Sequence, residues 1–258
     1  MTNARSPLLP PAALVTGAGR RIGRAIALDL AAAGFAVAAH YSTSRTDAEA
    51  VVAEIQAGGG RAVALAADLA REDEVATLVG RASAQLGPIG LLVNNASTFE
   101  RDDALSADRA SWDRHMEVNL RAPFVLTQDF ARALPEGAEG VVVNLLDQRV
   151  WNLTPHFTTY TLSKAGLWTL TQTLALALAP RIRVLAVGPG PALPSARQSD
   201  AQFATQAAGL PLGHGTSPAE ICAAIRFLLA MPSVTGQMIA LDGGQHLSWA
   251  IGGAPPDE

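Results

Sequence analysis

Two residues with complementary acid–base chemistry, Tyr160 and Lys164, lie four positions apart in the sequence. Tyr41 is the only other tyrosine, and Lys164 is the only lysine of the chain. Side chains at this spacing share one face of a helix. A nearby ammonium group favours the ionised phenol and lowers its pKa from about 10. The spacing therefore predicts a general acid at Tyr160 whose pKa is lowered by Lys164; the alternative is a surface pair on a helix.

A glycine-rich turn, Thr16–Gly23, follows the first apolar run and opens an amphipathic stretch. Glycines let the backbone approach a pyrophosphate, and the helix N-terminus attracts its negative charge. We expect Gly17, Arg20, Arg21 and Ile22 to bind a dinucleotide. The spacing is not G-x-G-x-x-G, so a glycine-rich turn without a ligand is the alternative.

The end of the second predicted strand carries His40, Tyr41 and Ser42 and no acidic residue. An acid at this place binds the ribose hydroxyls of NAD and would repel a 2′-phosphate. Hydroxyl and basic groups, including Arg20 and Arg45, would instead bind that phosphate. The sequence therefore favours NADP(H) over NAD, unless these are ordinary solvated surface residues.

Polar residues also follow the third and fourth predicted strands. Asp68, followed by Leu69, is placed to accept a hydrogen bond from the adenine amino group. Asn95, Ala96 and Ser97 are placed to line a ribose and to hold the strand end. Each of these residues is also compatible with a helix cap or a turn.

Asn119 lies within the long helical stretch that precedes the Tyr160–Lys164 pair. We expect it to hold a water molecule that returns protons to the pair. Alternatively, its amide only satisfies backbone groups near a helix break at Pro123.

The elements that position these residues alternate along the chain. Several short runs are apolar on both faces, which is typical of a parallel sheet covered by helices on both sides. Strict alternation of strand and helix implies right-handed crossovers and a doubly wound α/β (Rossmann) sheet. The predicted strands are Ala12–Thr16, Ala36–His40, Ala62–Ala66, Gly90–Asn94, Val141–Leu145, Ile182–Val187 and Met238–Leu241, and the predicted helices are Arg21–Ala33, Asp47–Ala57, Glu72–Gln85, Asp108–Leu134, Thr158–Leu178 and Pro218–Ala230.

The chain is interpreted as a single domain over residues 12–251, because no linker rich in Pro, Gly or Ser divides it. Residues 1–11 are expected to form a flexible tail and residues 252–258 a disordered one. The one long irregular stretch, residues 188–215, is the expected substrate loop, since long loops in compact domains are often functional. Ligands in such folds bind at the carboxyl ends of the strands, where strand order reverses.

Composition excludes several classes of function. The 258 residues are 49% hydrophobic and 16% charged, which indicates a folded chain, and a net charge of -4 argues against a nucleic-acid partner. The chain has neither a signal-peptide pattern nor an apolar run of about 20 residues, so we expect a cytoplasmic protein without a membrane span. Cys222, the only cysteine, is expected to be a small buried hydrophobe, and no metal site is predicted.

Together these residues resemble the short-chain dehydrogenase/reductase family over residues 12 to about 247. Pro189-Gly190, after the sixth strand, and Asp242-Gly243-Gly244, after the seventh, strengthen the resemblance. It implies that a hydride passes from a nicotinamide to a carbonyl or imine carbon while Tyr160 gives a proton. It also implies that Tyr160, Lys164, Pro189 and Gly190 contact the cofactor, with Lys164 reaching the nicotinamide ribose, and that the protein is a homotetramer.

Three departures from the family pattern narrow the substrate. The family's catalytic serine stands 13 residues before the tyrosine, where this chain has Asp147. Arg21 replaces a glycine of the turn, and Phe99 ends the fourth-strand motif. In these features the chain is similar to the pteridine reductase branch, including the dihydromonapterin reductases. That resemblance implies that Phe99 stacks on a pterin and that Ser97, Arg21, Asp147 and Tyr160 line its site, although Phe99 is also compatible with an ordinary apolar anchor.

The reaction implied is reduction of a dihydropterin C=N bond by NADPH, with Asp147 orienting the pterin or protonating a ring nitrogen. A 3-oxoacyl or other carbonyl reductase of the same family is the first alternative. Such an enzyme is expected to keep the serine, because a serine donates to a developing alkoxide and an ionised aspartate would repel it. A non-catalytic NADP(H)-sensing protein is the second alternative, and it is disfavoured because both Tyr160 and Lys164 are present.

Overall fold

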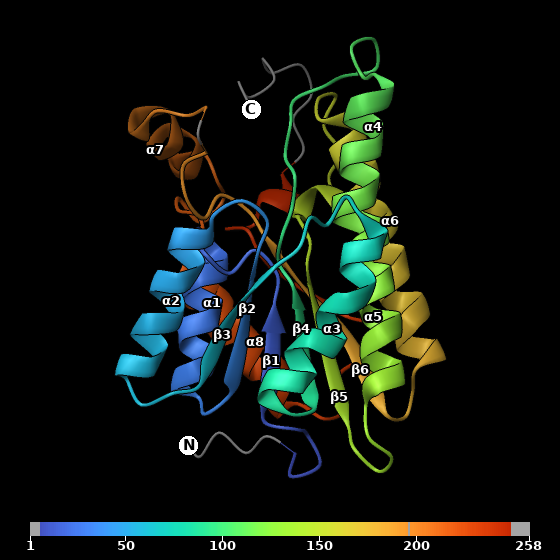
Figure 1. The fold of residues 1–258 in the computed structure, drawn as a ribbon. Coiled ribbons are helices and arrows are strands. Elements are labelled where there is room, and N and C mark those ends of the chain that lie inside the picture. Colours follow the sequence, from blue (N-terminus) through green and yellow to red (C-terminus); the bar gives the residue numbers. More distant parts are fainter. Residues whose placement is uncertain (1–5, 196, 249–258) are drawn as a thin grey trace.

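The computed structural model describes residues 6–195 and 197–248 of the chain. Seven parallel strands form one sheet in the order β3-β2-β1-β4-β5-β6-β7, which confirms the predicted doubly wound α/β fold (Figure 1). The strands are β1 (Ala12–Val15), β2 (Ala36–Tyr41), β3 (Ala62–Ala66), β4 (Ile89–Asn94), β5 (Gly140–Leu145), β6 (Ile182–Pro189) and β7 (Met238–Leu241).

Helices cover both faces of this sheet (Figure 1). On one face lie α1 (Arg21–Ala32), α2 (Arg45–Ala57) and α8 (Pro218–Ala230). On the other lie α3 (Glu72–Leu86), α5 (Ala122–Ala133) and α6 (Thr158–Ala177). Beyond one end of the sheet extend α4 (Arg109–Met116) and α7 (Asp200–Ala208), and the short helices are η1 (Glu117–Arg121), η2 (Gln148–Val150) and η3 (Gln245–Leu247).

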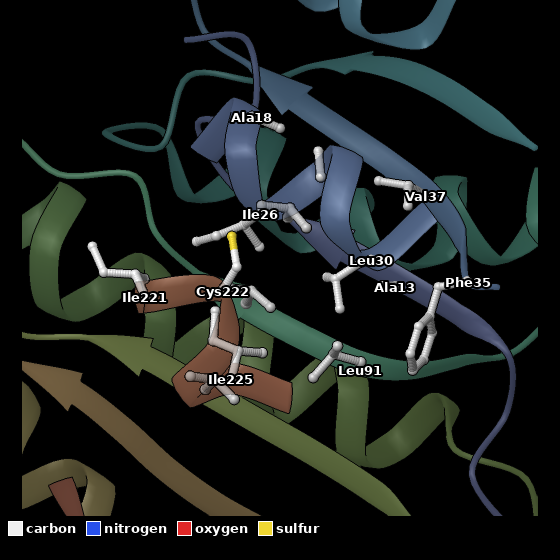
Figure 2. Close-up of a cluster of buried hydrophobic side chains, with 14 of the residues drawn as sticks. Ala13, Ala18, Ile26, Leu30, Phe35, Val37, Leu91, Ile221, Cys222 and Ile225 are labelled. Carbon is white, nitrogen blue, oxygen red and sulfur yellow. The ribbon is translucent and has the colours of Figure 1, made fainter. Parts of the chain in front are cut away.

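The core explains the doubly apolar strands. Every residue of β1, β2, β4 and β5 is buried, because helices cover both sides of these central strands. Figure 2 shows Ile26 and Leu30 of α1 packed with Ile225 of α8 over Leu91 of β4. Cys222 lies in the same cluster at 4% exposure, as its apolar helical pattern predicts. Burying each such aliphatic side chain contributes roughly 1.5–3 kcal/mol.

The order of the strands reverses between β1 and β4. From β1 the chain winds outward to β2 and β3, and from β4 it winds in the opposite direction to β7. The loops that follow β1 and β4 therefore diverge from adjacent strand ends and leave a crevice between them. The backbone N–H of Thr16 donates to the carbonyl of Val93 at 3.0 Å and ties the two strand ends together.

Two predicted elements differ from the structure. The single helix expected over 108–134 is interrupted by the π-helical turn Glu117–Arg121, which contains Asn119. The loop expected over 188–215 contains the helix α7, whose N-terminus is a capping box formed by Ser199 and Gln202. The Ser-x-x-Gln spacing was present in the sequence as a helix-start signal.

Part of the predicted N-terminal tail belongs to the domain. Leu9 is 6% exposed, and the backbone N–H of Glu139 donates to the carbonyl of Leu8 at 3.1 Å. Pro10 packs so closely on Gly90 that a Cβ there would lie 2.2 Å from the Pro10 carbonyl oxygen. The domain thus begins before residue 12, whereas residues 1–5 and the predicted tail 252–258 lie outside the described residues. Among the described residues, no helix has the length and apolar character needed to span a bilayer.

Candidate active site

The turn between β1 and α1 adopts left-handed backbone conformations at two positions. Gly17 has a φ of 63°, and a Cβ at this position would lie 3.1 Å from the Cα of Ala96. Arg21 has a φ of 52°, which costs a non-glycine residue roughly 1–2 kcal/mol. Arg21 therefore adopts a backbone conformation that glycine favours, and it adds a cation to the turn.

His40 holds this turn in place through the two nitrogen atoms of its ring. Its Nδ1 accepts a hydrogen bond from the backbone N–H of Gly17 at 3.1 Å, and its Nε2 lies 3.0 Å from the carbonyl of Ala67. The ring is 1% exposed, and this burial lowers the pKa of His40 to about 4. His40 is a buried neutral link between the turn and the ends of β2 and β3, it also lines the cavity at these strand ends, and its expected contact with the cofactor remains a prediction.

The end of β4 is joined to the same turn. Thr16 Oγ1 accepts from the backbone N–H groups of Asn95 and Ala96 at 2.9 and 3.0 Å. The Asn95 amide donates to the carbonyl of Thr16 at 2.8 Å. The Asn95 side chain therefore fixes the crevice wall, which is the strand-holding role foreseen for this motif.

A cavity of about 710 Å³ opens at these strand ends. Its size suits a cofactor-sized ligand. A Cβ at Gly19 would lie 3.1 Å from Ser44 Oγ and 3.2 Å from the backbone nitrogen of Ala48, so the glycine lets the turn pack closely on the start of α2. The fit to a dinucleotide is good, because the residues predicted to bind the adenosine and phosphate portions, apart from Arg45, line this cavity: Gly17, Arg20, Arg21, Ile22, His40, Tyr41, Ser42, Asp68, Leu69, Asn95, Ala96 and Ser97.

Two charged residues of this cavity already have protein partners. Arg20 Nε donates to Asp47 Oδ2 at 2.5 Å, with both side chains at least one-third exposed. The end of β2 has no acidic residue, but Asp47 of α2 provides a carboxylate nearby. A bound phosphate would compete with Asp47 for the Arg20 guanidinium. Asp68 Oδ1 accepts from the backbone N–H of Ala70 at 3.0 Å, which is the turn role considered for it.

The predicted catalytic pair lies in the first turns of α6. Tyr160 is 6% exposed, and its hydroxyl donates to Asp147 Oδ2 at 2.9 Å. The other carboxylate oxygen of Asp147 accepts the backbone N–H of Arg149 at 2.8 Å and caps η2. The structure therefore brings Asp147 directly to the phenol, as the 13-residue spacing predicts.

The acid strength of Tyr160 differs from the expectation. Burial, and after it the charge and hydrogen bond of Asp147, raise the pKa of Tyr160 well above its usual value. Arg149 is the cation that opposes this shift, rather than Lys164. The predicted lowering of the Tyr160 pKa by Lys164 is thus wrong, because burial and Asp147 raise this pKa and keep the phenol protonated.

Lys164 is directed to the sheet. Its Nζ donates to the carbonyl of Leu145 at 2.8 Å and lies 5.8 Å from the centre of the Tyr160 ring. Burial lowers the pKa of Lys164 to about 8, although Asp147 acts in the opposite direction. A buried ammonium of this kind exchanges protons readily near neutral pH.

The Asn119 amide is fully engaged by protein groups. Its Nδ2 donates to the Thr98 carbonyl at 2.9 Å and to Ser163 Oγ at 3.0 Å. Its Oδ1 accepts from the Thr98 backbone N–H at 2.8 Å and from Ser97 Oγ at 3.2 Å. The side chain therefore links the segment after β4 to α6. The water molecule that Asn119 was expected to hold remains a prediction.

A buried network that sequence analysis missed supports the start of α6. Asp102 is 4% exposed and accepts from the backbone N–H of Thr159 at 3.2 Å, and its other oxygen bonds to Ser111 Oγ at 2.6 Å and to Thr159 Oγ1. Burial acts to raise the pKa of Asp102, but the hydrogen bonds from Ser111 and Thr159 outweigh it and lower the pKa. Asp102 thus caps the helix that carries Tyr160, because the residue preceding that helix, Phe157, offers no side-chain cap.

Phe99 lies beside Tyr160 in an aromatic cluster. Its ring stacks on Phe157 with centroids 4.4 Å apart and meets Tyr160 edge-on at 4.6 Å. Phe157, with a φ of 60°, is fully buried. Phe99 therefore combines the two roles considered for it: it is an anchor on Phe157, and it lines a cavity of about 190 Å³ together with Asp147.

This smaller cavity, called the substrate pocket after the expectation from the sequence, lies between Asp147 and the segment 188–215, and neither Tyr160 nor Lys164 lines it. Among the predicted site residues it is lined by Arg21, Ile22, Phe99, Asp147, Pro189 and Gly190. Arg21 donates to the carbonyls of Pro194 and Leu193 at 2.8 and 3.3 Å, so the glycine turn holds the segment over the pocket. Ser97 lies in the larger cavity instead of the substrate pocket. Across residues 6–195 and 197–248, no cluster of three or more His, Cys, Asp or Glu side chains is arranged to hold a metal ion.

Comparisons with known proteins agree with this geometry. Residues 11–204 match the family model described as short chain dehydrogenase. The chain therefore belongs to the short-chain dehydrogenase family, and the predicted family and oxidoreductase class are confirmed.

Individual relatives differ in the activities that their names carry. The structure is similar to that of FolM alternative dihydrofolate reductase 1 from Brucella suis in complex with NADP, with a TM-score of 0.92, 50% identity, and 95% and 98% of the two chains covered. It is also similar to a short chain dehydrogenase from Burkholderia cenocepacia in complex with NADP, with a TM-score of 0.85, 35% identity, and 92% and 98% covered. A 3-oxoacyl-[acyl-carrier-protein] reductase from Synechocystis is 36% identical over 237 residues, which cover 90% of this chain and 95% of the relative.

Proposed function

We propose that this protein is an NADPH-dependent reductase of a dihydropterin-type C=N bond. The observation that carries the proposal is the Asp147 carboxylate, which accepts the hydrogen bond of the Tyr160 hydroxyl at 2.9 Å. A carboxylate beside the proton donor suits a substrate that presents N–H groups and is unfavourable for a developing alkoxide. The name of the Brucella relative, an alternative dihydrofolate reductase, supports a substrate of this class.

NADP(H) is the cofactor that fits the larger cavity. Arg20 and Ser42 line it near the end of β2, where the strand itself ends without an acid. Solved relatives from Brucella and Burkholderia were crystallised with NADP. The Arg20–Asp47 pair keeps a guanidinium at this place, from which it would bind the 2′-phosphate.

Tyr160 supplies the proton of the reaction. When bound, the nicotinamide provides the hydride that the substrate carbon accepts, and a ring nitrogen of the substrate then needs one proton. The Tyr160 hydroxyl is protonated at neutral pH because burial and Asp147 raise its pKa. Lys164, whose pKa burial lowers to about 8, stands on the same helix face to restore that proton. Asp147 orients the substrate by accepting one of its N–H groups.

The principal alternative is a 3-oxoacyl reductase, which is favoured by the names of curated relatives that are 34–36% identical. A reductase of either kind in this family uses a nicotinamide cofactor, so the cofactor cavity does not separate the two functions. Asp147 and Phe99 do separate them, because they line the substrate pocket. A cofactor-sensing protein without turnover is disfavoured, because Tyr160 and Lys164 are both buried at the site.

The variant Asp147→Ser tests the proposal, because it restores the family pattern at that position. We expect turnover of a dihydropterin to fall about 100-fold, of the order typical for one positioned catalytic group. We expect reduction of an acetoacetyl thioester to rise in the same variant, with the Kd for NADPH unchanged. Unchanged pterin turnover in Asp147→Ser would refute the role given to this carboxylate.

A homotetramer is proposed from the resemblance and from one surface feature. A hollow of about 380 Å³ on the outer side of η1, α5 and α6 is lined by Leu120, Phe124 and Leu170. A second copy of the chain would cover this apolar surface. Sedimentation at micromolar concentration tests the assembly, and a monomer would contradict it.

A further inference from the structure

Arg149, in the short helix η2, is a buried cation without a carboxylate partner. Its side chain is 8% exposed, and within the described segments no Asp or Glu lies at ion-pair distance. Its one side-chain hydrogen bond runs from Nη1 to Thr154 Oγ1 at 3.1 Å. A guanidinium has five N–H donors, and buried charges are ordinarily paired. Arg149 therefore has donors available for a group that enters the site.

Aromatic rings hold this guanidinium in place. Its central carbon lies 4.7 Å from the ring centroid of Phe157 and 5.5 Å from that of Phe99. Cation–aromatic contacts of this kind stabilise a charge that is removed from water. Because Phe99 and Phe157 stack on each other, the position of Arg149 is fixed relative to Tyr160 by the same cluster.

Arg149 and Asp147 together present a donor and an acceptor to the substrate pocket. Both residues line it, and Asp147 accepts the backbone N–H of Arg149. Two other arginines near the pocket already have oxygen partners. Arg21 donates to the carbonyls of Leu193 and Pro194. Arg197 shares the rings of Phe99 and Phe157 with Arg149, at 5.1 and 5.6 Å, but it also donates to the Phe99 carbonyl and lies 3.7 Å from Glu100, with 39% of its side chain exposed.

We propose that Arg149 is a substrate-binding residue that donates to an oxo oxygen of a flat heterocycle while Asp147 accepts the neighbouring N–H. The ligand class is a ring with a –CO–NH– edge, such as a 2-amino-4-oxopteridine. A 2,4-diaminopteridine carries a donor in place of the oxygen and would not accept from Arg149. This proposal rests on the proposed function, and it adds a residue that selects among pteridines.

Binding of two non-reacting probes to the NADP-saturated protein tests this role. The probes are 2-amino-4-oxopteridine and 2,4-diaminopteridine, and their Kd values are measured by titration calorimetry. For Arg149→Met we expect affinity for the oxo compound to fall at least tenfold, as is usual for loss of a charged hydrogen bond. We expect affinity for the diamino compound to change less than threefold.

Two further variants keep the test decisive. Arg149→Lys retains a charge without the planar fork, and we expect a smaller loss that is confined to the oxo compound. If Arg149→Met does not fold, this variant alone decides. Arg109→Met removes an exposed arginine of α4 and is the matched control, with both affinities unchanged.

Equal losses for both probes, or no loss, would overturn the role of Arg149. A parallel loss of NADP affinity would also overturn it, because Arg149 would then contact the cofactor. A second outcome separates the two proposals. If the wild-type protein does not reduce dihydropterins, but Arg149→Met still loses affinity for the oxo probe alone, the proposed reaction is refuted and this inference stands. Normal dihydropterin turnover with unchanged probe affinities in Arg149→Met would refute this inference alone.

Discussion

The two cavities at the carboxyl ends of the strands are built by different means. The larger one is formed mainly by short turns directly after β1, β2, β3 and β4, with α4 and η1 on one side, and hydrogen bonds between side chains and backbone join those turns. The substrate pocket is formed by long side chains and by the segment 188–215, which crosses from β6. Strand ends are fixed by the sheet, whereas the side chains that surround the substrate pocket depend on packing among themselves. The first cavity therefore suits a ligand shared by a whole family, and the second can vary with the substrate.

The largest expected effect on activity lies in the substrate half of the site, meaning Tyr160 and the substrate pocket. Tyr160→Phe removes the proton donor while keeping the ring that meets Phe99, and we expect kcat to fall about 10²–10⁴-fold. The Kd for NADPH, measured by fluorescence titration, should change less than twofold, because Tyr160 does not line the larger cavity. Turnover retained in this variant would contradict the assignment of the proton donor.

The cofactor half of the site, meaning the larger cavity, is tested by Arg20→Ala. Loss of a guanidinium that binds a phosphate costs roughly 1.5–3 kcal/mol, so the preference for NADPH over NADH should fall at least tenfold. Arg45→Ala, an exposed arginine of the same region paired weakly with Glu49 at 3.8 Å, serves as the comparison. A preference that depends on Arg45 and not on Arg20 would move the phosphate site along α2.

The pH dependence of stability tests the role of His40, which holds the turn of the cofactor half. His40 has a folded-state pKa of about 4, below its unfolded value of about 6.5. The unfolded chain therefore binds the proton first, so stability is retained above pH 6.5 and lost as pH falls toward 4. The full span corresponds to about 3 kcal/mol. His40→Gln should flatten the fall in Tm between pH 7 and 4.5, whereas His214→Gln, at an exposed position, should leave it unchanged.

The smallest effect is expected at Arg21, which lines both cavities. Arg21→Gly relieves a left-handed conformation at a non-glycine residue, which stabilises the turn by about 1 kcal/mol. The same change removes the hydrogen bonds from Arg21 to Leu193 and Pro194. We expect a slightly higher Tm and a severalfold higher KM for the dihydropterin. A lower Tm together with an unchanged KM would show that Arg21 does not connect the turn to the segment.

The cofactor half was also the more predictable from sequence. Its residues follow strands whose apolar pattern is local, so Gly17, Asp68 and Asn95 were placed from strand order alone. The closeness of Asp147 to Tyr160 was accessible as well, through the resemblance to a family whose catalytic serine stands 13 residues before the tyrosine. Arg149 and Asp102 were not found, since their roles depend on Phe157 and Thr159, which the fold brings to them from other segments. The lowering of the Tyr160 pKa was also wrong, because burial and the Asp147 charge outweigh any cation.

The most direct test mixes the purified protein with NADPH and follows the loss of its absorbance on adding 7,8-dihydromonapterin or 7,8-dihydrobiopterin, with an acetoacetyl thioester in parallel. Rapid oxidation with a pterin and little with the thioester is the predicted result. Rapid oxidation with the thioester alone would leave Tyr160 and Lys164 as the catalytic pair and would contradict the substrate site assigned to Asp147 and Phe99.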